Sequence, residues 1–299
     1  MTDDEAAQQG LASGESGPNA QLEAALRATL DRHGYGFQYA LLNRIGELRI
    51  PWGIESPEFP VSFRGGTTHI DFVLRLMRDT GMPVRIAAEC KRANPALIDW
   101  CFVRSPLAHR GDEVALETVR VNITLGKAYG SVDLRNAWHS DRVYGLGFPI
   151  KGSAHGDKAG DNRTALDDAV AQVLRGANGL MEFLASEPTL LRHHGENGYA
   201  RVVPVIFTTA RLWVSDVNLS ESELSTGRVP PSPLTEIDWL WLKQNISPTL
   251  KAPFLRDEQP GEYRETLRDY VVRDFARCIG VVSVSGVESF LRNSYLIGM

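Results

Sequence analysis

The sequence predicts an α/β protein in which a central mixed β-sheet is flanked by helices and followed by a C-terminal αβα extension. Three observations support this fold class. First, two segments near the N-terminus have good helix formers or apolar residues at helical spacing. Second, these segments are followed by short apolar runs bounded by turn residues, which are typical of strands. Third, a long amphipathic helix is followed by another apolar run. The resulting order is helix, strand, strand, strand, helix, strand, which indicates a sheet with helices on its faces.

The composition is that of an ordinary soluble protein. The chain has 299 residues, 43% hydrophobic and 23% charged, which is enough to bury a sizeable core. No apolar run approaches the roughly 20 residues that span a bilayer, and the N-terminus is acidic and polar. We therefore expect a cytoplasmic protein that makes no membrane contact. The three cysteines form no CxxC pair, so the sequence indicates neither a disulfide framework nor a cysteine zinc site.

The net charge of −5 excludes nucleic-acid binding through global basicity but leaves a local basic cleft open. Arginine supplies most of the basic residues, and its planar fork suits phosphate oxygens better than a lysine does. A biased base composition of the coding gene explains the same excess of arginine, and both explanations stay open.

Three parts of the chain are expected: a disordered tail over residues 1–18, a core domain over 19–218 and an extension packed on that core over 219–299. Within the core, a helix capped by Asn19 ends near Gly34, and a second helix follows. The predicted helices cover residues 20–32, 37–48, 164–185, 263–277 and 287–295.

The predicted strands are short runs between turn signals. One begins at Glu58 and reaches Phe63, and the next two carry Asp71 and Glu89. Further strands are expected over 113–124, 142–150, 201–214 with an internal turn, and 279–284. The intervening polar or proline-bearing segments are expected to be a structured loop over 93–112, a mobile tract over 151–162 and a linker over 220–233.

The stretch from Thr68 to Asn94 carries the strongest chemical signal. It is expected to form two strands joined by a turn, the first bearing Asp71 and the second bearing Glu89 and Lys91 on one face. If the strands are neighbours, two carboxylates and an ammonium converge at one edge of a sheet, an arrangement that holds a divalent metal beside a phosphate. The alternative is a solvated ion pair at a sheet edge, which would be only weakly stabilising.

With Asp71 in HIDFVL and Glu89, Cys90 and Lys91 in AAECKR, the chain resembles the PD-(D/E)XK, or restriction endonuclease-like, nuclease superfamily over roughly residues 35–215. The resemblance implies that Asp71, Glu89 and the main-chain carbonyl of Cys90 bind Mg²⁺ (or Mn²⁺). It also implies that Lys91 orients or activates the attacking water. Ile70 replaces the proline of the superfamily name, a common departure that leaves the chemistry unaffected.

Many members add an acid from a neighbouring element and a glutamine from the later helix. Glu58 is the preferred acid because it heads a strand that can lie beside Asp71, with Glu47 as the other candidate. Gln172, on the polar side of the long helix, is the candidate glutamine. A solvated surface side chain is the alternative interpretation of each.

Other polar and aromatic residues give weaker signals. His69 shares the face of Asp71 and could touch substrate, and Trp239 and Trp241 could stack on a base or belong to the core. His193 and His194 are interpreted as surface residues. Near the site in sequence, four basic side chains are candidates for phosphate binding or for a solvated face: Arg92, Arg104, Arg110 and Lys127.

By resemblance, the expected function is a metal-dependent nuclease acting on DNA, with RNA as an alternative substrate and a role in restriction or anti-phage defence. The expected partners are a second copy of the chain, as a homodimer, or a partner protein of a defence system. Two other functions stay open. One is a nuclease-fold module that binds nucleic acid or a partner protein without cutting, and the other is a hydrolase of a different phosphate ester.

Overall fold

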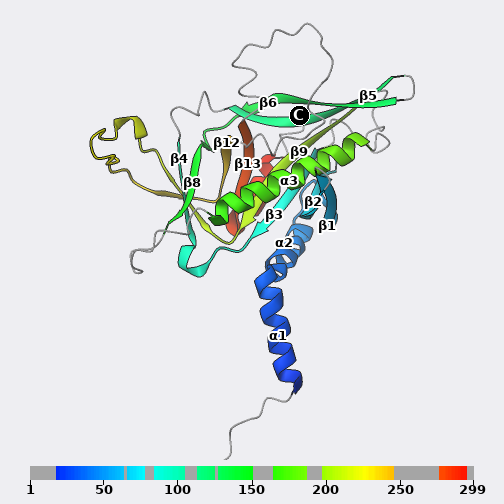
Figure 1. The fold of residues 1–299 in the computed structure, drawn as a ribbon, viewed down its shortest axis with the longest axis horizontal. Helices are drawn as coiled ribbons and strands as arrows, with labels where there is room; N and C mark the ends of the chain where they lie inside the picture. The colour runs from blue at the N-terminus through cyan, green and yellow to red at the C-terminus, as the bar shows by residue number, and fades with distance from the viewer. Residues whose placement is uncertain are drawn as a thin grey trace, which may run out of the picture.

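The computed structural model describes residues 18–63, 66–77, 84–104, 113–124, 127–150, 164–186, 197–245 and 276–294 (Figure 1). Its helices are α1 (Pro18–His33), α2 (Tyr35–Glu47), α3 (Thr164–Ser186) and α5 (Val287–Ser294). Its strands are β1 (Trp52–Phe63), β2 (Gly66–Leu76), β3 (Val84–Lys91), β4 (Asp99–Val103), β5 (Glu113–Thr124), β6 (Lys127–His139), β7 (Val143–Tyr144), β8 (Leu146–Ile150), β9 (Asn197–Thr208), β10 (Arg211–Ser215), β11 (Thr235–Ile237), β12 (Trp239–Asn245) and β13 (Ala276–Ser283).

Nine of the described strands form one central mixed sheet, so the predicted α/β class with helices beside a mixed sheet is confirmed. Its main path runs β1-β2-β3-β9-β13-β12-β7. The pairs β1–β2 and β2–β3 are antiparallel, whereas β9 is parallel to β3 and β13 is parallel to β9. Strand β5 also pairs with the first half of β9 and with β6.

Helix α3 lies across one face of this sheet, on the connection that leads from β3 to the parallel strand β9 (Figure 1). Parallel neighbours need such a crossover because the chain must return to the same end of the sheet. The apolar side of α3 packs on the sheet through buried residues that include Val173, Ala177 and Met181. One side of the helix therefore lies next to the middle of β2 and the C-terminal end of β3.

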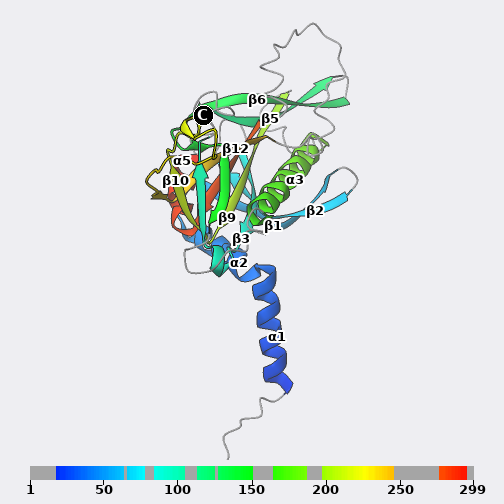
Figure 2. The same cartoon turned by 60° about the vertical axis from the view of Figure 1, so that its left-hand side comes forward.

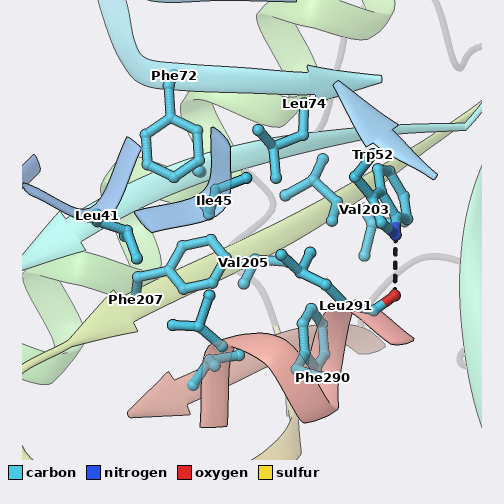
Figure 3. Close-up of a cluster of buried hydrophobic side chains, with 14 of the residues drawn as sticks. Leu41, Ile45, Trp52, Phe72, Leu74, Val203, Val205, Phe207, Phe290 and Leu291 are labelled. Carbon is cyan, nitrogen blue, oxygen red and sulfur yellow. Dashed lines mark hydrogen bonds between the residues drawn. The ribbon is translucent and has the colours of Figure 1, made fainter. Parts of the chain in front are cut away.

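The opposite face of the sheet is covered by α2 and α5. In Figure 3, Leu41 and Ile45 of α2 and Phe290 of α5 meet the side chains of β2 and β9 in one apolar cluster. The indole Nε1–H of Trp52 donates a hydrogen bond of 2.9 Å to the carbonyl of Leu291, which ties β1 to α5. The N-terminal and C-terminal parts of the chain thus share one core.

The side chains of β2 lose their regular alternation between Ile70 and Phe72. These two residues would share a face in a regular strand, yet Phe72 packs in the cluster of α2 and α5, whereas Ile70 packs against α3. Opposite this point Glu58 has a left-handed backbone, with φ of 49°. The outer half of the β1–β2 hairpin consequently curls towards α3.

A second sheet of four described strands, in the order β11-β10-β4-β8, packs beside the first half of α3. Helix α1 has exposed leucines and extends away from the body of the molecule in both Figure 1 and Figure 2. Among the described residues, no helix has the length and apolar character required to cross a membrane.

The structure corrects several predicted elements. The strand predicted from Glu58 to Phe63 begins earlier, at Trp52, so Glu58 lies in the middle of β1. Pro57 and Pro60 fit within this strand because β1 is at the edge of the sheet, where proline is tolerated. The predicted loop over 93–112 contains β4, β6 was not predicted, and the strand predicted over 142–150 divides into β7 and β8 in different sheets.

The predicted αβα extension also differs from the structure. Strands β12 and β13 belong to the central sheet, with β13 beside β9, and the apolar face of α5 enters the main core. The helix predicted over 263–277 lies outside the described residues except for its last two positions, which begin β13. The tail predicted over 1–18 lies outside them up to residue 17, with Pro18 opening α1, and so does the predicted mobile tract over 151–162.

Candidate functional site

Asp71 and Glu89 lie side by side on neighbouring strands. The antiparallel register of β2 and β3 pairs Phe72 with Ala88, and the same register continued by one residue places Asp71 opposite Glu89. The backbone N–H of Cys90 donates a hydrogen bond of 2.6 Å to Oδ2 of Asp71, which fixes the carboxylate at this end of the sheet. The predicted convergence of the two acids is therefore present.

Lys91 is held between β3 and α3. Its Nζ lies 2.9 Å from Oε1 of Glu89 and also donates to Oε1 of Gln172. Glu89 is 7% exposed, so the pair is no solvated surface ion pair. The crossover helix thus brings Gln172 to the end of β3, as the sequence predicted.

Glu58 joins the site from the middle of β1, opposite Asp71 between the pairs Pro57–Phe72 and Phe59–Ile70. The amide of Gln38 on α2 donates to Oε1 of Glu58 at 2.5 Å and to the main-chain carbonyl of Asp71 at 2.7 Å. Because Gln38 is 3% exposed, both bonds are shielded from water. Gln38 therefore holds Glu58 beside the strand that carries Asp71.

The sequence reasoning missed Gln38, although a signal for it exists. Gln38 precedes Leu41, Leu42 and Ile45 at the spacing i, i+3, i+4, i+7, so it occupies the apolar stripe of α2. A polar residue at a core position needs a hydrogen-bond partner, and here the partner is the site.

The clustered acids make ionisation unfavourable. Burial and then the Asp71 carboxylate raise the pKa of Glu89 to about 7, against the lowering effect of Lys91 and Arg175. Burial also raises the pKa of Asp71, and Glu58 raises it further, whereas the Cys90 N–H lowers it. Burial and these same carboxylates raise the pKa of the Cys90 thiol well above its usual range. The site holds more negative charge than its own cations offset.

An open pocket of about 460 Å³ lies above the carboxylates. Asp71 and Glu89 line it together with Gln172 and Arg175 from α3. The other lining residues belong to the outer half of the β1–β2 hairpin: Phe63, Gly66, Thr67, Thr68 and His69. His69 lines the same pocket as the two acids, and its contact with a substrate stays a prediction.

The oxygen donors of this site fit Mg²⁺ or Mn²⁺. In the described part of the chain, no three His, Cys, Asp or Glu side chains are grouped so as to enclose a metal ion. Mg²⁺ does not require such a cage, because it commonly binds through one or two carboxylates and keeps water or phosphate oxygens as its other ligands. Asp71, Glu89 and the carbonyl of Cys90 would be the protein ligands, and a cation there would offset the charge that raises the pKa of Glu89.

The remaining candidates lie elsewhere or pair elsewhere. Glu47 is exposed on α2 and pairs with Asn43 and Arg44, Arg92 pairs with Asp31 at 3.9 Å, and Arg104 pairs with Asp216. Trp241 is buried and contacts Phe290, which confirms its interpretation as a core residue. Trp239 is half-buried and packs against the same phenylalanine at the margin of the core. Three candidates lie outside the described residues, namely Arg110, His193 and His194, and the side chain of Lys127 is not described.

Comparisons of the chain with models of known protein families, with curated proteins and with solved structures found no match. The geometry of the site itself is therefore the basis for assigning a function.

Proposed function

We propose that the protein is a metal-dependent nuclease that hydrolyses phosphodiester bonds, with DNA as the expected substrate. The observation that carries this proposal is that Asp71, Glu89 and Gln172 line one pocket while Lys91 contacts both Glu89 and Gln172. Glu58 lies opposite Asp71 on the neighbouring strand. The succession of an antiparallel β1–β2–β3 meander, α3, and a β9 strand parallel to β3 supports a restriction endonuclease-like fold.

The chemistry follows from charge. When bound by Asp71, Glu89 and the Cys90 carbonyl, Mg²⁺ or Mn²⁺ supplies positive charge to the phosphate and lowers the pKa of a water. An ammonium has three N–H donors, and Lys91 uses donors towards Glu89 and Gln172. The remaining N–H is available to orient the attacking water or a phosphate oxygen. Glu58, held by Gln38, adds a third carboxylate beside the ligands.

Substitution of the central residues tests this assignment. Asp71→Ala, Glu89→Ala and Lys91→Ala should each lower the cleavage of supercoiled and linear DNA by at least about a hundredfold, because each removes a metal ligand or the water-orienting group. Cleavage is measured on gels with Mg²⁺, with Mn²⁺ and with a chelator, and circular dichroism checks folding. Glu47→Ala is the matched control, since Glu47 pairs only with neighbours on its own helix. Undiminished cleavage by all three variants would refute the assignment.

A second candidate is a nuclease-fold module that binds nucleic acid or a partner protein without cutting. The 2.9 Å contact of Lys91 with Glu89 favours it, because a carboxylate already neutralised by lysine has less need of a metal. Calorimetric titration with Mg²⁺ or Mn²⁺ separates the candidates. The nuclease should bind metal and lose that binding in Asp71→Ala, whereas the module should bind none. A screen of nucleotides against plasmid and oligonucleotides would expose a hydrolase of another phosphate ester.

The biological setting we propose is restriction or anti-phage defence, with a second copy or a partner protein completing the assembly. Plasmid-transformation and phage-plating efficiencies of cells that carry the wild-type gene or the Asp71→Ala gene test this setting directly. A role in defence predicts a lower efficiency with the wild-type gene only.

A further inference from the structure

Arg175 is a cation at the pocket that the proposed reaction does not yet use. It lies one helical turn after Gln172 on α3, half-buried, in the wall of the pocket. Within the residues that the structure describes, its guanidinium makes no hydrogen bond and no ion pair, in contrast to Arg85, which binds both carboxylate oxygens of Glu55. A half-buried guanidinium without a protein partner is available to a ligand in the pocket.

The position of Arg175 favours an anionic ligand that also reaches the acids. The positive charge of Arg175 lowers the pKa of Glu89. The ion pair with the Glu89 carboxylate, however, is made by Lys91. The β1–β2 hairpin contributes Thr67, Thr68 and His69 to the lining of the same pocket. An arginine fork is well suited to the oxygens of a phosphate, and threonine and histidine side chains are further donors to such oxygens.

We propose that Arg175, together with Thr67, Thr68 and His69 from the lining of the same pocket, forms a subsite for a second backbone phosphate beside the one that is cleaved. The substrate is then a polynucleotide strand, because a mononucleotide ester has no second phosphodiester to occupy the subsite. This inference rests on the proposed nuclease function. The pocket of about 460 Å³ lies in the range of sites that hold small molecules, which is enough for a nucleotide segment of one strand.

The first test is binding without cleavage. A fluorescent single-stranded oligonucleotide is titrated in the presence of a chelator, and its anisotropy is followed at several salt concentrations. Arg175→Ala should weaken binding by about tenfold and reduce the slope of log affinity against log salt by about 0.7, the value for one phosphate contact on a single strand. Arg175→Lys should retain part of the affinity. Arg228→Ala, an exposed arginine away from the pocket, should change neither quantity.

The second test compares two substrates with Mg²⁺ present. Bis(p-nitrophenyl) phosphate contains one phosphodiester and no second phosphate, so Arg175→Ala should raise KM for the oligonucleotide by a larger factor than KM for this small substrate. An oligonucleotide affinity and salt slope that do not change, or a wild type that does not bind the oligonucleotide, would overturn the subsite. Equal losses of kcat on both substrates would overturn it too and would assign Arg175 to the reaction itself. If the wild type binds the oligonucleotide but cuts neither substrate, the nuclease function fails, while the binding test still decides the role of Arg175.

Discussion

Burial of the acids in the middle of β2 and near the end of β3 opposes folding at neutral pH. Glu89 has a pKa of about 7 in the folded chain, against an ordinary value of 4.5. Between these values the folded state binds more protons than the unfolded state, so the free energy of unfolding falls as pH rises through this window. Such a cost at a cluster of like charges is typical of functional sites, where groups are placed for chemistry and not for stability.

Glu89→Gln should therefore stabilise the protein in the absence of metal. At pH 8 with a chelator, we expect the free energy of unfolding to increase by about 1–3 kcal/mol, since the buried charge is removed. At pH 4.5, where the folded Glu89 is protonated, the difference should nearly vanish. Urea unfolding at both pH values measures it, with the exposed Glu47→Gln as the control. A variant less stable than the wild type at pH 8 would contradict the charge argument.

At the scale of residues, the sequence was sufficient where alternation fixed the face. Glu89 and Lys91 interrupt an apolar strand and share a face because β3 alternates, whereas Asp71 lies beside Glu89 although β2 loses its alternation between Ile70 and Phe72. The prediction that Glu58 lies on a strand beside Asp71 was correct, but its predicted position at the start of that strand was wrong, because β1 extends through its prolines to Trp52. Gln38 reaches Glu58 and Asp71 from twenty and more residues away, and neither its rotamer nor its partners can be read from local pattern.

At the scale of elements, the close approach of α3 to the β1–β2 hairpin depends on small residues. A Cβ added at Gly179 would lie 2.7 Å from Cγ2 of Val61 and 3.1 Å from the carbonyl oxygen of Ser62. At Gly176 an added Cβ would lie 2.9 Å from Cγ1 of Ile70. These glycines let the outer half of the hairpin pack on the helix that carries Gln172 and Arg175, so they help to form the pocket.

Gly179→Ala should destabilise the protein by about 1–3 kcal/mol, because overpacking outweighs the gain of about 1 kcal/mol in helix propensity. Val61→Ala should relieve the contact, so the double variant should be more stable than the sum of the single effects predicts by about 1 kcal/mol. Chemical unfolding of the wild type, the two single variants and the double variant measures this coupling free energy. Strictly additive effects would show that the helix and hairpin do not meet at these atoms.

The elements that the sequence missed depend on distant pairing. The run Asp99–Val103 is short and lies between prolines. It forms β4 by pairing with two strands distant in sequence, β8 and β10. The division of residues 142–150 into β7 and β8 likewise follows from their partners, β12 and β4. Helices α2 and α3 were predicted closely because their apolar stripes are local and need no partner to be recognised.

At the scale of the whole molecule, the C-terminal residues complete the sheet that positions the site. Strand β13 pairs with β9 through Gly280–Val205 to Ser283–Thr208, and β9 in turn pairs with the end of β3 that carries Glu89 and Lys91. Phe290 and Leu291 of α5 enter the same core as α2 and β2 (Figure 3). Loss of β13 and α5 would expose the edge of β9, an interior strand, and the side of the core that α5 covers.

A chain that ends at residue 218 should therefore fail to fold. It would lack β12, β13 and α5, leaving β9 with an exposed edge and its apolar face open to water on the side of Phe207 and Val205. We expect no cooperative thermal transition, weak near-ultraviolet circular dichroism and aggregation. A chain that lacks residues 1–17 is the control, and it should unfold as the full chain does, because none of the described core lies there. A cooperative transition in the chain of residues 1–218, at the wild-type temperature, would instead show that the first 218 residues form an independent domain and that the C-terminal strands only dock against it.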